Sequence, residues 1–188
     1  TLTLASTGAA QMQFSNNGSN YGSFVTYATS YSHTLTNTQG TQTVYVQFKD
    51  ALGNAAAAVS DTIDFDSVAP TMILSTGDVA DGGTHNAAVT MTFTSSESTS
   101  NFIESDITVT NASISNFSGS GTTYTATITP SGSSPSVMVE ANKFTDANGN
   151  GNTASNSYSW THDTTPPTNA SISINGGNTY TNSTSVTL

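Results

Sequence analysis

Apolar and polar residues alternate in short runs along most of the chain. Successive side chains of a β-strand point to opposite faces, so this period of two indicates strands with one buried face. Gly, Asn, Asp and Pro residues separate the runs and are typical of turns. A helical period is nearly absent, apart from the short run 55–58. The predicted strands cover residues 1–6, 43–48, 61–65, 71–75, 88–94, 106–111, 123–129, 136–141, 157–160 and 170–175.

Short strands at this spacing predict an all-β fold of antiparallel β-sandwiches. An internal repeat then indicates more than one domain, because FKDALGN (48–54) returns 96 residues later as FTDANGN (144–150). Each copy is followed by a strand and by a closing phrase, DSVAPT (66–71) or DTTPPT (163–168). The period matches one sandwich of the immunoglobulin size, so the repeat predicts tandem domains.

The prolines of the two closing phrases indicate linkers between domains. Proline has no N–H with which to extend a ladder and favours extended geometry in the preceding residue, so these joints are expected to be stiff. Residues 1–69 are predicted to form a sandwich that lacks its first strand or strands. Residues 70–167 are predicted to form a complete sandwich, and residues 168–188 the initial strands of the next repeat.

The two ends of the sequence continue one another. Placing Thr187 and Leu188 on Thr1 and Leu2 gives STSVTLTLAS, an unbroken alternating strand. We therefore expect residues 168–188 of one copy to complete the open sandwich of the next copy through residues 1–6. The neighbour is either the next repeat of a longer polypeptide or a separate copy joined by strand addition. The covalent form is the simpler expectation, because any tandem array cut at an arbitrary point shows this order.

Several phrases resemble the bacterial Ig-like repeats of large surface adhesins and extracellular fibre proteins. The phrases cover residues 43–71, 102–130, 144–168 and 182–188. The resemblance implies tandem sandwiches that form a stalk or shaft, often stiffened by calcium.

Charge excludes two classes of partner. The chain has twelve acidic residues and two basic ones, Lys49 and Lys143, for a formal net charge of -10. This charge opposes binding to nucleic acid or to an anionic membrane surface, and no apolar run is long enough to predict membrane insertion. Cysteine is absent, which suits an oxidising compartment. We expect an extracellular or cell-surface location in a bacterium.

The segment DANGNG (146–151) is the clearest chemical motif. It matches the first six positions of a D-x-[DN]-x-[DN]-G calcium loop, with oxygens from Asp146, Asn148 and Asn150. The twelfth position is Ser157, where such loops carry a bidentate glutamate. The alternative is that Asp146 caps a hairpin turn through its side chain.

Other acidic residues are expected close to the ends of domains, where a cation could restrict bending of a joint. Because the chain has no arginine to pair these carboxylates, a hard cation is a natural counter-ion; the alternative is that they are simply solvated. The candidate calcium ligands outside the DANGNG segment are Asp50, Asp66, Glu104, Asp106 and Asp163.

Catalytic patterns are absent from the sequence. His33, His85 and His162 are scattered, and no H-E-x-x-H or G-x-S-x-G motif occurs. We therefore expect no enzymatic activity. The aromatic group Tyr21, Phe24, Tyr27 and Tyr31 could stack on sugars, although packing on the sandwich is the plainer expectation.

These observations predict a structural repeat unit of a bacterial fibre, adhesin stalk or sheath, with a ligand of the cell surface or matrix as a further candidate partner. The alternative is a carbohydrate-binding accessory module of an exported hydrolase.

Overall fold

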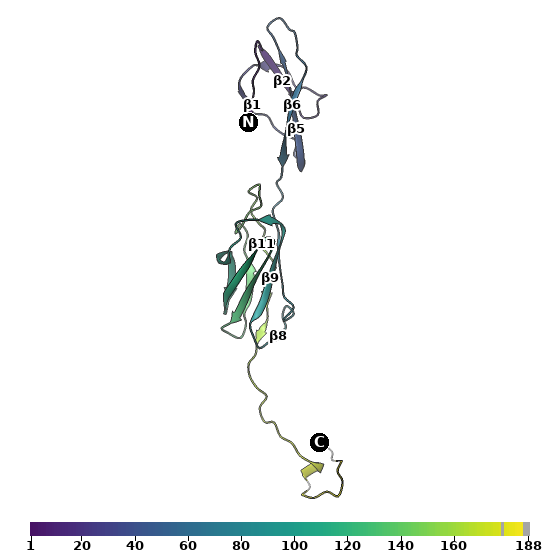
Figure 1. Ribbon diagram of the computed structural model, residues 1–188, viewed down its shortest axis with the longest axis vertical. Helices are drawn as coiled ribbons and strands as arrows, with labels where there is room; N and C mark the ends of the chain where they lie inside the picture. Colours follow the sequence, from purple (N-terminus) through teal and green to yellow (C-terminus); the bar gives the residue numbers. More distant parts are fainter. Residues whose placement is uncertain (178, 186–188) are drawn as a thin grey trace. The chain divides into compact units, whose positions relative to one another are not determined.

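The computed structural model describes residues 1–177 and 179–185. The chain divides into two compact units, the first formed by residues 1–69 with 147–150 and the second by the rest. Strands dominate both units (Figure 1), which confirms the predicted all-β class. The helical elements of the described residues are two short 3-10 turns, Glu104–Asp106 and Asn175–Gly177. No described helix has the length and apolar character needed to cross a membrane.

The first unit contains a four-stranded antiparallel sheet and a separate two-stranded pair. The sheet has the order β3-β2-β5-β6, with β3 Val25–Thr26, β2 Gln11–Ser15, β5 Gly40–Lys49 and β6 Val59–Phe65. The pair joins β1 Leu2–Thr3 to β4 Ser30–Tyr31. Alternate residues of β2 and β5 point inward, and the core consists of Met12, Phe14, Val44, Val46 and Phe48.

The predicted strands of this unit are confirmed in part. Residues 43–48 and 61–65 lie within β5 and β6. Of the predicted strand 1–6, only Leu2 and Thr3 are in a strand. The sequence also carried a signal for β2 that the prediction missed, because Met12 and Phe14 alternate with polar residues and both are buried.

The second unit is a β-sandwich of two three-stranded antiparallel sheets. One has the order β11-β9-β7, with β11 Ala112–Pro130, β9 Val89–Thr99 and β7 Met72–Ser75. The other has the order β10-β12-β13, with β10 Ile107–Thr110, β12 Ser136–Val139 and β13 Tyr158–Ser159. Side chains from both sheets, together with Phe102, Phe144 and Trp160, form one core.

A parallel pair also belongs to the second unit. Strand β8, Thr84–His85, runs beside β14, Thr161–His162, with Thr84 opposite Thr161. The link continues in both directions, since Thr161 donates its N–H to the Gly83 carbonyl over 2.8 Å and Asp163 donates to His85 over 3.2 Å.

The long segment β11 folds back on itself. The Asn116 amide donates to the Thr127 hydroxyl, and Ser131 donates its N–H to the Asn111 carbonyl. Gly119, with φ of 138°, lies at the fold, where a Cβ would come within 2.4 Å of the Thr123 carbonyl oxygen. The sequence predicted only residues 123–129 as a strand here. The observed strand is longer because Gly119 allows the backbone to fold back closely on itself.

The predicted strand over 170–175 is wrong for the isolated chain. Residues 170–174 are in no strand, and a 3-10 turn begins at Asn175. A strand needs a neighbour for its N–H and C=O groups, and no described strand pairs with this segment. Ile172 is 74% exposed and Ile174 is 48% exposed. The predicted continuation from Thr187 and Leu188 into residues 1–2 lies outside the described residues.

Candidate functional site

The turn that follows β5 is stabilised by Asp50. One of its carboxylate oxygens accepts the N–H groups of Leu52 and Asn54, and the other accepts the Asn54 side-chain amide. These bonds, led by that from the Asn54 side chain, hold the pKa of Asp50 below its usual value. Asp50 therefore serves as a turn cap, the alternative that the sequence left open for Asp146.

The equivalent segment of the repeat forms a similar turn. Isolated bridges join Lys49 to Ala55 and Thr145 to Gly151. Gly53 and Gly149, at matching positions, have φ of 94° and 90°. The two similar segments, 48–54 and 144–150, therefore share a backbone conformation as well as a sequence pattern.

The repeat differs one residue after its closing bridge, where Ala56 of the first copy corresponds to the buried Asn152 of the second. The Asn152 side-chain oxygen accepts the N–H groups of Lys143 and Phe144, and its amide donates to the carbonyls of Glu140 and Thr153. The Asn152 side chain therefore supplies hydrogen-bond partners for four backbone groups next to the second turn.

Asp66 and the segment 147–150 belong to the first unit. The Asp66 carboxylate accepts the Val68 N–H and the Asn148 side-chain amide, each over 2.9 Å. Its backbone carbonyl accepts the Asn150 amide over 3.3 Å. The structure thus brings together three of the predicted ligands, with the two amide nitrogens directed toward Asp66.

A pair of carboxylates lies in the second unit. Oxygens of Glu97 and Asp146 are within 4.8 Å of each other, and Asp146 is only 8% exposed. Paired carboxylate oxygens are the ligand type that Ca²⁺ prefers. Sequence reasoning missed Glu97, because it lies on β9 and is 49 positions from Asp146 in the sequence.

The remaining acidic candidates lie elsewhere. Asp106 accepts the Ile103 N–H at the start of the first 3-10 turn, and Glu104 is exposed in the same turn. Asp163 accepts the Thr165 N–H over 2.8 Å. That bond, helped by the Thr165 side chain and nearby His162, lowers the pKa of Asp163. Asp106 and Asp163 therefore cap local turns.

Two of the three histidines are neighbours. His85 and His162 lie opposite each other across the β8–β14 pair, although 77 residues separate them in the sequence. His33 lies in the first unit, with its Nε2 at 2.7 Å from the Asn16 side-chain oxygen. Burial lowers the pKa of His33.

Two of the four aromatic residues proposed as a sugar platform, Tyr27 and Tyr31, pack on the core. Tyr31 stacks on Phe14 with ring centroids 4.5 Å apart, and Tyr27 meets Phe48 edge to face at 5.9 Å. The Lys49 ammonium lies 3.9 Å from the centre of the Phe24 ring. These contacts favour the packing role over an exposed stacking surface.

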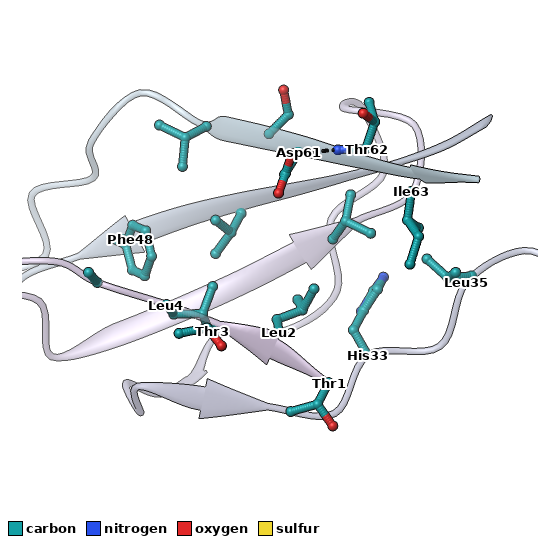
Figure 2. Close-up of a pocket in the computed structure, with 15 residues that line it drawn as sticks. Thr1, Leu2, Thr3, Leu4, His33, Leu35, Phe48, Asp61, Thr62 and Ile63 are labelled. Atoms are coloured by element: carbon teal, nitrogen blue, oxygen red, sulfur yellow. Dashed lines mark hydrogen bonds between the residues drawn. The ribbon is translucent and has the colours of Figure 1, made fainter. Parts of the chain in front are cut away.

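The first unit has an apolar groove of roughly 540 Å³ between residues 1–5 and β6. Figure 2 shows Leu2 and Leu4 on one side of the groove and Ile63 on the other. Its apolar lining consists of Leu2, Leu4, Ala5, Leu35, Val44, Val46, Phe48, Val59 and Ile63. We name this feature the β1–β6 groove.

A protein-family model described as a bacterial Ig-like domain matches residues 66–162. The match starts at Asp66 and ends at the last residue of β14. No curated protein matches the chain.

Proposed function

Because the chain belongs to the bacterial Ig-like domain family, we propose that it is a structural repeat unit of an extracellular bacterial fibre, adhesin stalk or sheath. Members of this family are often extracellular or on the cell surface, and membership indicates a structural or surface domain. In this role the units join head to tail with equivalent neighbours, bind a ligand of the cell surface or matrix, and carry out no catalytic step.

The internal repeat carries the proposal. The turn after β5 and the turn at 145–151 share their bridge and glycine positions at an offset of 96 residues. A repeated building block extends length without changing its local packing, which is how repeat proteins build shafts.

The topology of the second unit also suits a chain under tension. The chain enters this unit near Pro70, just before β7, and leaves after β14. A pull on both ends draws the parallel strands β8 and β14 in opposite directions along their axes. The bonds from Thr161 to Gly83 and from Asp163 to His85 are then loaded together, in shear, so they resist the pull jointly.

Single-molecule pulling of the full chain from its two ends tests this role. The second unit is expected to unfold in a distinct high-force event. Thr161→Pro removes the N–H that bonds Gly83 and should lower that force, whereas Thr161→Val keeps the N–H and should leave it nearly unchanged. Equal forces for all three chains would contradict the proposal.

We further propose that calcium stiffens the second unit through Glu97 and Asp146. The two carboxylates offer hard oxygen ligands, and Asp146 opens the DANGNG segment. A cation bound only by the folded state would stabilise that state.

The fluorescence of Trp160 provides the test of calcium binding, because this single tryptophan lies in the core of the second unit. Millimolar calcium is expected to raise the unfolding temperature that it reports. Asp146→Asn should abolish most of the increase, while Asp50→Asn, at the matching position of the first turn, should preserve it. A calcium response that is unchanged in Asp146→Asn, or absent from the unmodified chain, would contradict the site.

A further inference from the structure

Two histidines occupy matching positions on the neighbouring strands β8 and β14. These strands run parallel, and their register places His85 opposite His162 and Thr84 opposite Thr161. Side chains at opposite positions of two paired strands extend from the same face, and neighbouring strands lie about 4.8 Å apart. The two imidazole rings therefore start from adjacent points on one face of the pair, although they are far apart in the sequence.

Burial distinguishes the two faces of this pair, which lies at one end of the second unit (Figure 1). Thr84 and Thr161 are exposed, whereas His85 and His162 are both half-buried. Trp160 precedes His162 by two positions, on the same face of the extended chain, and is buried in the core. The two histidines therefore lie at the rim of the core, where solvent and dissolved ions still reach them.

Hydrogen bonds fix the backbone at both histidines. Asp163 donates its N–H to the His85 carbonyl over 3.2 Å, and on the other edge of β14 His162 donates to the Ser133 carbonyl over 2.9 Å. The folded unit thus holds both histidines in place before any ligand arrives, and rotation of the side chains is enough to bring two ring nitrogens together. Such preorganisation lowers the entropy cost of binding.

Two imidazoles on neighbouring strands are a suitable ligand set for a divalent transition-metal ion. Imidazole nitrogen binds Zn²⁺, Cu²⁺ and Ni²⁺, whereas Ca²⁺ prefers oxygen. A Zn–N bond is about 2.0–2.1 Å long, so two nitrogens on one tetrahedral ion are separated by roughly 3.3 Å. Side chains from strands about 4.8 Å apart can adopt that separation.

Charge near the pair favours a cation. Asp163 directly follows His162, and the Asp81 carboxylate accepts the Ser159 N–H of the nearby β13 over 2.8 Å. The whole chain has a net charge of -10. A negative surface raises the local concentration of cations, so metal ions are attracted to this region.

We propose that His85 and His162 together bind one divalent transition-metal ion, Zn²⁺ or Cu²⁺, with water at the remaining coordination positions. The ion connects β8 to β14 through the two side chains and adds a link to the pair that the backbone hydrogen bonds already join. The site is independent of the proposed fibre role. It also differs in ligand type from the carboxylates of Glu97 and Asp146, whose oxygens suit calcium.

Trp160 provides a signal for binding, because Cu²⁺ quenches the fluorescence of a nearby tryptophan. It is the single tryptophan of the chain and lies two residues before His162, about 7 Å along an extended strand. Titration of the full chain with Cu²⁺ is expected to give saturable quenching at one ion per chain. His85→Gln or His162→Gln should each weaken binding at least about tenfold, because one imidazole alone cannot chelate. His33→Gln, which removes the third histidine, should leave the affinity unchanged.

A double variant distinguishes one shared ion from two independent sites. If both rings hold the same ion, His85→Gln with His162→Gln should bind only slightly more weakly than either single variant. Single variants that keep the full affinity but bind fewer ions would overturn the proposal. An unmodified chain that binds Cu²⁺ no more tightly than the double variant would also overturn it. Unfolding followed by Trp160 fluorescence without metal checks that each variant is folded.

Zinc tests the ligands without any substitution. One equivalent of Zn²⁺ added to the unmodified chain should shift the ring NMR signals of His85 and His162 together and leave those of His33 in place. Millimolar Ca²⁺ should not reverse these shifts, because imidazole is a poor ligand for that ion. Shifts at one histidine of the pair alone, equal shifts at His33, or displacement of Zn²⁺ by Ca²⁺ would contradict a shared site.

Discussion

The Asp50 carboxylate accepts three hydrogen bonds within its own turn. Asp146 has the same place in the repeat but is buried and lies beside Glu97. Identical residues in a repeated phrase thus face different surroundings, one solvated and local, the other enclosed with a second carboxylate. This contrast makes Asp50 the natural control for Asp146.

The hydrogen bonds of Asp50 predict a pH dependence. Its folded-state pKa lies below the ordinary value of 3.8, so the ionised form stabilises the folded turn. This stabilisation is complete above pH 3.8 and is lost as the pH falls through the lower, folded-state pKa.

The carboxyl carbon-13 signal of Asp50 should therefore titrate below 3.8, and Asn54→Ala should move the midpoint upward. Asn101→Ala, at an amide with no bond to this turn, should leave it unchanged. A midpoint at the ordinary value in the unmodified chain would contradict this description of the turn.

Asn152 predicts a loss of stability confined to the second unit. Asn152→Ala leaves the N–H groups of Lys143 and Phe144 without their acceptor and should cost about 1–3 kcal/mol. Urea unfolding followed by Trp160 fluorescence measures the loss. Asn86→Ala, at an exposed position, is the control, and its free energy of unfolding should stay within about 0.5 kcal/mol of that of the unmodified chain. An equally small change for Asn152→Ala would show that the hydrogen bonds of Asn152 contribute little.

Residue chemistry was only partly predictable from the sequence. The DANGNG motif made Asp146 a candidate ligand, because ligand spacing within one loop is visible in the sequence. Glu97 and the neighbouring His85 and His162 depend on which strands pair, and local sequence does not carry that information.

At the level of elements, the return within β11 depends on glycine. Gly119 has φ of 138°, and a Cβ there would lie 2.5 Å from the Tyr124 Cα. Gly119→Ala should cost about 1–3 kcal/mol from backbone strain, with the clash adding to it. Gly77→Ala is the matched control, since a Cβ there meets nothing within 4 Å. Unfolding followed by Trp160 fluorescence measures the stability of both variants. Equal stabilities would contradict the conclusion that β11 folds back at Gly119.

Strands with buried alternate residues were predictable, as for β5, β7 and β12, because a period of two depends only on the strand's own side chains. The strand over 170–175 has the same pattern but does not form in the isolated chain. The pattern specifies which face of a strand is apolar. Strand formation also needs a neighbouring strand, and none of the chain's described strands pairs with this segment.

For the whole molecule, charge and apolar surface act in opposite directions on assembly. The net charge of -10 keeps copies apart at low ionic strength, while the proposed head-to-tail contacts would favour their association. Salt at about 0.15 M screens charges beyond roughly 8 Å, so association should strengthen as salt is added.

The molar mass of the unmodified chain, followed by light scattering over a wide range of concentrations at this ionic strength, tests the central claim most directly. A head-to-tail joint does not close on itself, so the average mass should rise steadily above the 19.3 kDa of one copy without a plateau. A mass that remains at 19.3 kDa at every concentration would contradict assembly between copies.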